Sequence, residues 1–400
     1  MRVAGGGQLT TLAPSKGRSA RPGLSERLRA VAADLDWILL AAVIAATALG
    51  LFVLKMSTSD DVAGSPNYYF ARQALFVAAG AVVMLVAARW DTAELPRWIW
   101  PLFWGLLIAL AVVFVLGRAA GGATRWVDLG PLSLQPSEMG KVAIALVLVG
   151  VAVERRTMLS PTAFTLTLTA VAAVPMFVIA LQPDLGTGIV YGVILAAVLF
   201  LSGAPWGHLA AGAALLAIAA SLVLWALPAA GVHVLADYQR ERLTAFVGSD
   251  RDTSDQGYQL DQSTTAIGSG GALGKGPDGA TQTQNDFLPE HHTDFIFAVT
   301  AEMLGFVGGA GLILLYALVI WRGLRVTAQA STPTDQVLAG AIVAMLAFQV
   351  FVNIGMTVRL MPITGIPLPL MSYGGSHTLT TFAAVGLLLG IHRRRSHLTS

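Results

Sequence analysis

Residues 37–55 read WILLAAVIAATALGLFVLK, an almost entirely apolar stretch that closes on a lysine. A helix needs about 20 mostly apolar residues to cross the hydrocarbon core of a membrane. This stretch is therefore long enough to span a membrane, and it indicates the fold class if others like it follow.

Nine further apolar stretches follow it along the chain. They cover roughly 71–89, 98–117, 137–153, 162–181, 186–203, 207–229, 293–321, 336–357 and 376–392. The weakest are 137–153, which carries two charges, and the pair 186–203 and 207–229, which are separated by Gly203-Ala204-Pro205-Trp206 alone. The sequence predicts an all-α polytopic membrane protein with about ten transmembrane helices.

The composition agrees with this fold class. Of the 400 residues, 55% are hydrophobic and 12% are charged, whereas soluble globular chains carry about 25% charged residues. A net charge of +2 argues against nucleic acid as a partner. The absence of cysteine excludes disulfides and thiolate metal sites.

The distribution of basic residues predicts the orientation. Lys and Arg collect in the cytoplasmic loops of membrane proteins, and one side of a ten-span arrangement would carry fifteen of the 25 basic residues, including both tails. Both termini are therefore expected in the cytoplasm. The expected parts are a basic tail without a signal peptide (1–36), seven helices (37–229), a long extracytoplasmic loop (230–292), three helices (293–392) and a second basic tail (393–400).

The outer loops are the ones that look suited to chemistry. Connections longer than about 12–15 residues are uncommon unless they are functional or disordered, and 230–292 is far longer. Loops 118–136 and 358–375 lie on the same side, and the second is rich in Pro and Gly. The inner loops are short, so the outer face is where a reaction is expected.

The stretch Pro289-Glu290-His291-His292-Thr293-Asp294-Phe295-Ile296-Phe297 ends the long loop and opens the eighth span. Thr293 or Asp294 could cap that helix, because Asp accepts hydrogen bonds from free N–H groups and favours the positive helix end. Alternatively, Asp294 is a general base whose carboxylate pKa is raised by a half-dry setting. The residues alone leave both interpretations open.

Glu138 and Lys141 open the fourth span, three residues apart and so on one helix face. Each charge alone would cost about 2.5–3.5 kcal/mol at mid-membrane, and pairing relieves much of that cost. A structural ion pair and a site that lines a cavity both fit the spacing.

Other polar segments have a plain interpretation beside a functional one. Asp184, after Gln182-Pro183, fits a turn that caps the next helix. Arg240 and Arg242 lie on an amphipathic turn and either are solvated or meet lipid headgroups or a pyrophosphate. A nucleotide phosphate loop has a glycine six residues before its lysine and a serine or threonine directly after it, and the segment Gly268–Gly276 does not meet this pattern. We therefore interpret it as a loop whose backbone can approach a ligand.

His291 and His292 raise the question of a metal. Adjacent residues rarely ligate one ion on a helix, and the chain has no HExxH motif or cysteine cluster, so a structural zinc ion is not expected. No cofactor is required by the sequence. One alternative stays open: a loosely held divalent cation could bridge Asp294 and the phosphates of a ligand, since such ions keep few protein ligands.

Several of these motifs, in this order, resemble the SEDS family (RodA, FtsW and SpoVE) over about 35–392, and the RodA branch most closely. The matching segments are Arg125-Trp126, Gln135-Pro136-Ser137-Glu138 with Lys141, Gln182 to Thr187, Tyr238-Gln239 with Arg242-Leu243, Gly257-Tyr258-Gln259 with Gln262-Ser263, Ala266 to Gly271 with Gly274-Lys275-Gly276, Phe287 to Glu290 with His292 to Val299 and Glu302, and Pro362 to Gly375. The chain departs from the family pattern at Gly248-Ser249, Asp252-Thr253, Ala280 and His377.

The resemblance implies a peptidoglycan glycosyltransferase for cell elongation and shape. It would polymerise lipid II into β-1,4 glycan strands on the outer face of the bacterial cytoplasmic membrane, beside a class B penicillin-binding protein. The family's essential loop aspartate matches Asp294, and the Glu138–Lys141 pair matches one thought to shape the cavity.

An inverting transfer needs a single base, which is Asp294, and cations to stabilise the leaving pyrophosphate. The candidates are Arg125, Lys141, Arg240, Arg242 and Lys275. A lipid II flippase and a non-catalytic scaffold that activates a penicillin-binding protein are the alternatives.

Overall fold

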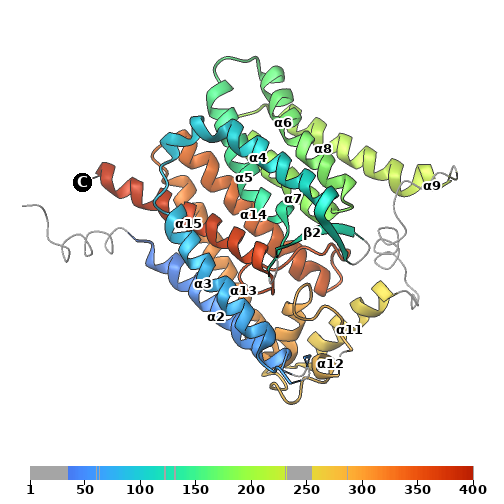
Figure 1. Cartoon of the computed structure of the whole chain (residues 1–400). Helices are drawn as coiled ribbons and strands as arrows, with labels where there is room; N and C mark the ends of the chain where they lie inside the picture. Colours follow the sequence, from blue (N-terminus) through green and yellow to red (C-terminus); the bar gives the residue numbers. More distant parts are fainter. Residues whose placement is uncertain are drawn as a thin grey trace, which may run out of the picture. The chain divides into compact units, whose positions relative to one another are not determined.

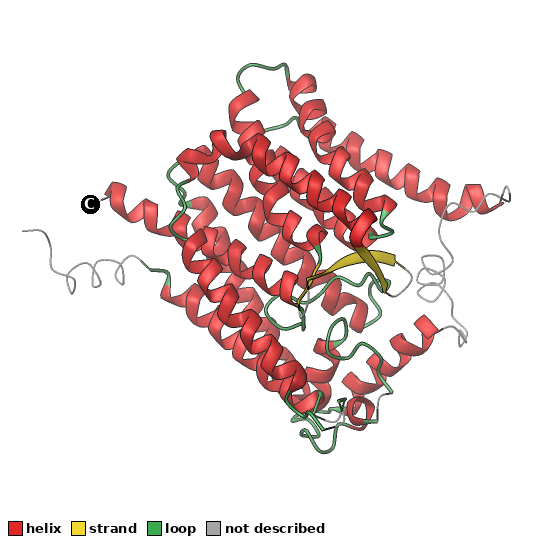
Figure 2. Ribbon diagram, in the orientation of Figure 1, coloured by secondary structure: helices red, strands yellow, loops and turns green. Residues whose placement is uncertain are grey.

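The computed structural model describes residues 35–59, 61–62, 64–120, 123–129, 132–229, 231, 255–285 and 287–399. From Asp36 onward they belong to one compact unit, which is almost wholly helical (Figures 1 and 2). The first seven apolar segments form α2 (Trp37–Ser57), α3 (Tyr68–Ala87), α4 (Leu95–Leu116, after the 3-10 turn η1, Thr92–Glu94), α5 (Pro136–Arg155), α6 (Pro161–Leu181), α7 (Leu185–Leu201) and α8 (Trp206–Ser221).

The π-helical turn η2 (Leu222–Ala226) and α9 (Leu227–Ala229) continue α8. The other helices of the described residues are α11 (Asp255–Ser269), α12 (Thr281–Gln284), α13 (Ile296–Ala328), α14 (Pro333–Thr357) and α15 (Gly375–Thr399).

Among the described residues, eight helices are long and apolar enough to cross a membrane, and α7 is a shorter apolar helix. All ten predicted spans therefore fall on helices, and the break at Gly203 to Trp206 separates α7 from α8 as expected. The protein is a multi-pass membrane protein. The count of ten crossings and the side of each terminus stay predictions.

Two of the helices form the centre of the unit. In α5, 72% of the most apolar 18-residue stretch is buried, and in α14 the corresponding share is 67%. Helix α5 packs against α4, α6, α7, α14 and α15, while α14 packs against α7 and α13, as Figure 1 shows. In the helical stretch that begins with α8, none of the most apolar 18 residues is buried, so these apolar side chains can face lipid.

A small antiparallel sheet lies in the loop predicted at 118–136. Its strands are β1 (Gly117–Ala120), β2 (Ala123–Leu129) and β3 (Leu132–Leu134), in the order β1-β2-β3 (Figure 2). Val127 pairs with Gly117 on one side and Leu134 on the other. The sequence predicts only a loop here, because strands of three to seven residues are too short for a clear alternating pattern.

The long loop 230–292 contains helices as well. Helix α11 lies across its middle and the single turn α12 lies near its end, and α11 packs against α13 and α14. Arg240 and Arg242, two of the predicted phosphate-binding residues, lie outside the described residues.

Candidate functional site

Asp294 lies just before α13. The N-cap residue is Phe295, whose side chain makes no capping hydrogen bond. The Thr293 hydroxyl donates to the Glu290 carboxylate at 2.8 Å. The backbone N–H groups of residues 293–295 all donate to the carbonyl of Glu290, so the chain turns tightly just before α13, and the cap interpretation stays a prediction.

Three consecutive carbonyls around Asp294 are held from outside the segment. The Tyr373 N–H donates to the carbonyl of His292 at 3.0 Å. The Ser372 hydroxyl donates to that of Thr293 at 2.6 Å, and the Asn353 amide donates to that of Asp294 at 3.0 Å. The backbone that carries the partly exposed Asp294 side chain is thus fixed at three successive points.

The Pro- and Gly-rich segment 362–375 supplies two of these three donors. It is irregular and mostly buried, which is tolerated at membrane depth where protein covers it. The Ser372 hydroxyl also accepts from the Leu368 N–H at 2.8 Å, and the Asn353 amide donates to the Ile366 carbonyl at 2.9 Å. The same two side chains therefore hold this segment and the Asp294 backbone together.

Glu138 and Lys141 form the predicted ion pair. Nζ of Lys141 lies 2.6 Å from Oε1 of Glu138, and the two residues are 0% and 4% exposed, respectively. His377 joins them, since its Nδ1 lies 3.3 Å from the other oxygen of Glu138. Because the pair is fully enclosed, it acts on a ligand only through the groups around it.

Asp184 is the centre of a neighbouring polar cluster. It is the N-cap of α7 and accepts from the Thr187 N–H at 3.3 Å, as the turn interpretation predicts. Its carboxylate also accepts from Gln135 and Ser137 at 3.1 and 3.0 Å. Nη1 of Arg125, on β2, lies 3.8 Å from the same carboxylate, so this predicted phosphate ligand has an anionic partner within the protein.

Leu368 links the enclosed charges to the Asp294 segment. Nε2 of His377 lies 3.3 Å from the Leu368 carbonyl, while the Leu368 N–H donates to Ser372. Glu138 is thus connected to the Thr293 carbonyl through His377, Leu368 and Ser372. Two motifs far apart in the sequence meet in one hydrogen-bonded chain.

The glycine-rich segment 268–276 packs on a kink in α13. Gly305, inside that helix, has a φ of 66°, and the N–H groups of Lys275 and Gly276 donate to the Glu302 and Met303 carbonyls. A Cβ at Gly274 would lie 2.1 Å from the Met303 oxygen. These glycines therefore permit backbone-to-backbone contact with α13, where the sequence analysis expected approach to a ligand.

Lys275 and Glu302 lie at the same contact. The buried Glu302 carboxylate accepts from the N–H groups of Gln282 and Thr283 at 2.9 and 3.2 Å, and from the Thr283 hydroxyl. Nζ of Lys275 is 4.0 Å from Glu302, with 34% of its side chain exposed. Of the predicted cations that the structure describes, Lys275 is the most accessible.

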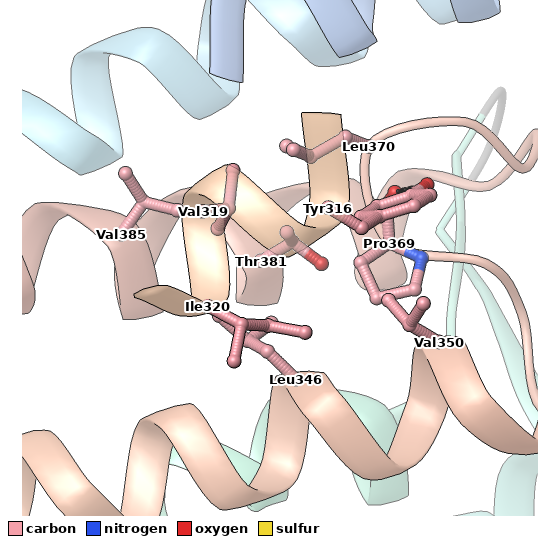
Figure 3. A pocket seen from close by; sticks show the side chains of 9 residues that line it. All are labelled: Tyr316, Val319, Ile320, Leu346, Val350, Pro369, Leu370, Thr381 and Val385. Atoms are coloured by element: carbon pink, nitrogen blue, oxygen red, sulfur yellow. Dashed lines mark hydrogen bonds between the residues drawn. The ribbon is translucent and has the colours of Figure 1, made fainter. Parts of the chain in front are cut away.

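An apolar pocket opens between α13, α14 and α15 (Figure 3). Its lining contains no charged side chain: Tyr316, Val319, Ile320, Leu346, Val350, Pro369, Leu370, Thr381 and Val385. The Tyr316 hydroxyl donates to the Pro369 carbonyl. The pocket therefore offers apolar contact and no acid–base chemistry.

Sequence reasoning missed several members of the site. Ser372 and Asn353 were not singled out, since a polar residue beside or within an apolar span carries no signal of what it contacts. His377 was noted only as a departure from the family pattern, and that departure falls on the residue that contacts Glu138. Asp61 was not considered, yet with His291 and His292 it forms the one group of three metal-ligating side chains found among the described residues.

Comparison with known proteins places these motifs in a family. Residues 33–397 match the FtsW/RodA/SpoVE family model, described as cell cycle protein. The peptidoglycan glycosyltransferase MrdB of Escherichia coli is 40% identical over 81% of this chain and 85% of its own length. The probable peptidoglycan glycosyltransferase FtsW of Halorhodospira halophila is 39% identical over 87% and 88%.

Solved structures agree with this result. A chain from a study of polymerization and crosslinking by a peptidoglycan synthase complex is 33% identical and superposes with a TM-score of 0.72, covering 90% of this chain and 98% of that one. The rod shape determining protein RodA of Thermus thermophilus is 30% identical, with a TM-score of 0.65 over 90% and 97%. The family match spans nearly the whole sequence and the fold agrees with it, so this chain belongs to the FtsW/RodA/SpoVE family.

Proposed function

We propose that this chain is a peptidoglycan glycosyltransferase, the activity after which its MrdB and FtsW relatives are named. It polymerises lipid II into β-1,4 glycan strands for cell elongation and shape. The observation that carries the proposal is the Asp294 segment, whose backbone is held at three consecutive carbonyls while the carboxylate-bearing side chain stays partly exposed.

The proposed reaction transfers a glycan chain from undecaprenyl pyrophosphate to the 4-hydroxyl of an incoming lipid II. The new bond joins the anomeric carbon to that oxygen, the bond from the anomeric carbon to the phosphate oxygen breaks, and Asp294 takes the hydroxyl proton. An α-linked donor that gives a β-linked product requires one inversion. A single base is therefore sufficient, whereas most glycosidases use two carboxylates.

The fixed backbone supports this role for Asp294. A general base contributes about 10²–10⁴-fold to a rate, and it does so only where it is held within reach of the proton that it accepts. Bonds from Tyr373, Ser372 and Asn353 restrict the position of Asp294 without using its carboxylate.

The basic residues take two different roles in the proposal. Lys275 is exposed enough to stabilise the leaving pyrophosphate, and Arg240 and Arg242 stay candidates for the same task. Arg125 would have to exchange Asp184 for a phosphate. Glu138 and Lys141 are enclosed, so we assign them to positioning of the segment around Leu368 rather than to direct contact with substrate.

The proposed location is the bacterial cytoplasmic membrane, with both termini in the cytoplasm and the Asp294 segment on the extracytoplasmic side. The distribution of Lys and Arg supports this orientation. A class B penicillin-binding protein is the proposed partner, in keeping with the peptidoglycan synthase complex that contains a similar chain.

The test uses the full chain purified with its penicillin-binding partner and supplied with labelled lipid II. Asp294→Asn removes the base with little change in shape, and we expect polymer formation to fall by about 10²–10⁴-fold. The matched control is Asp261→Asn, which changes a half-exposed aspartate paired with Arg359 and should leave the rate unchanged. Equal polymer from wild type and Asp294→Asn would refute the assignment.

Two other outcomes separate the alternative functions. Lipid translocation by both forms, with polymer from neither, would favour a flippase. Crosslinking by the partner that depends on this chain, but not on Asp294 or on any polymer that this chain makes, would favour a scaffold.

A further inference from the structure

We propose that Asp61, His291 and His292 bind a divalent transition-metal ion, with Zn²⁺ as the reference case. Asp61 lies in the connection between α2 and α3, and the two histidines lie in the turn before α13. The site would join the outer end of the first helical pair to the segment that leads into Asp294.

The ligand atoms already lie close to one another. One atom from each of the three residues lies within 4.8 Å of the other two. In a tetrahedral site with metal–ligand distances of about 2.0–2.1 Å, two ligand atoms are about 3.3 Å apart, and Nε2 of His291 lies 3.3 Å from Oδ2 of Asp61. One edge of the tetrahedron is therefore formed, and the ligand atom of His292 lies within 4.8 Å of both of the other ligand atoms.

The two imidazole rings have a suitable relative placement. They lie in a turn rather than in a helix, which removes the objection that neighbouring helical residues diverge. Their centroids are 5.2 Å apart and their planes are inclined by 76°. Two imidazoles on one tetrahedral ion have centroids about 5 Å apart, so both rings can serve the same ion.

The side chains of the proposed ligands are largely enclosed by the protein. The His291 and Asp61 side chains are only 6% and 15% exposed. Nδ1 of His292 is buried and has no hydrogen-bond partner among the described residues. An imidazole nitrogen without a protein partner is a suitable metal ligand.

The donor set indicates the class of ion and of additional ligand. Two imidazoles and one carboxylate suit Zn²⁺ and similar ions better than Mg²⁺ or Ca²⁺, which prefer oxygen ligands. Three protein ligands leave a coordination position open, which water or an anionic oxygen would take. The inference does not rest on the proposed function, because it concerns binding of the metal alone.

The test measures Zn²⁺ binding by calorimetry on the full chain, purified without a polyhistidine tag and stripped with EDTA. We expect one Zn²⁺ per chain, and Asp61→Asn or His291→Ala should weaken binding at least about tenfold. The matched controls are Asp261→Asn and His208→Ala, whose side chains contact Arg359 and Thr165 away from this cluster. Both controls should bind as wild type does.

Three results would overturn the site: no saturable Zn²⁺ binding by wild type, binding that Asp61→Asn and His291→Ala leave intact, or equal losses in the controls. If both site variants fail to fold, the Co²⁺ absorption spectrum of wild type decides, since a spectrum without tetrahedral bands would equally refute the assignment. Asp294→Asn should keep full Zn²⁺ affinity. Failure of polymerisation is thereby distinguished from failure of metal binding.

Discussion

Glu138 is the centre of the enclosed charge cluster, and its loss should cost more than the loss of Lys141. Glu138 has two basic neighbours, Lys141 at 2.6 Å and His377 at 3.3 Å. Lys141 is 0% exposed, and Glu138 is its ion-pair partner within the described part of the chain. Glu138→Gln therefore leaves a buried ammonium without a counter-charge, which costs about 3–5 kcal/mol.

Lys141→Met leaves Glu138 beside His377, so we expect a smaller loss of about 1–3 kcal/mol. The double variant has neither charge and should be close to the Lys141→Met variant in stability. The two substitutions are then strongly non-additive, with a coupling energy about equal to the cost of Glu138→Gln, about 3–5 kcal/mol. The measurement is equilibrium unfolding in mixed micelles, followed by circular dichroism.

The exposed pair Glu94–Arg97 provides a control with the same spacing. Its charged atoms are 3.8 Å apart, and its side chains are 52% and 80% exposed. An exposed pair contributes about 0–1 kcal/mol, so the same cycle there should give little coupling. Equal losses for Glu138→Gln and Lys141→Met, or an additive double variant, would refute the reasoning about the enclosed cluster.

Three other predictions concern the segments around Asp294. Ser372→Ala removes the hydroxyl that holds the backbone before Asp294. We expect kcat for lipid II polymerisation to fall about fivefold with KM kept, since one hydrogen bond is worth about 1 kcal/mol, and an unchanged kcat would contradict this. Gly274→Ala should destabilise the protein by about 2 kcal/mol or more in thermal unfolding, because φ at Gly274 is +82° and a Cβ would lie 2.1 Å from a carbonyl oxygen of α13. The control Gly268→Ala should be neutral or slightly stabilising, since a Cβ there would have nothing within 4 Å. Burial and the neighbouring His291 lower the pKa of His292 in the folded protein, whereas histidine in the unfolded chain has a pKa of about 6.5. Just below pH 6.5 the unfolded chain therefore binds more protons than the folded one, and in EDTA the free energy of unfolding should fall as the pH drops. His292→Gln should flatten this dependence on pH.

The apolar spans could be located from the sequence because each is a local pattern. A run of about 20 apolar residues has few alternatives to a membrane helix, and even the weak spans around 137–153 and on either side of Gly203 to Trp206 correspond to helices. The spacing of Glu138 and Lys141 likewise predicted their ion pair, since residues three apart share a helix face. The strands at 117–134 and the helix α11 were not predicted, because short polar segments lack such a pattern.

The sequence by itself determined the membrane fold, the family motifs and the candidate carboxylate. Only the tertiary structure decided what each polar group contacts. The backbone around Asp294 is held by Asn353 and Ser372, and Glu138 has His377 as a second neighbour. The physical reason is that these hydrogen bonds join residues tens to hundreds of positions apart. Their geometry depends on how the helices pack, which no local pattern records.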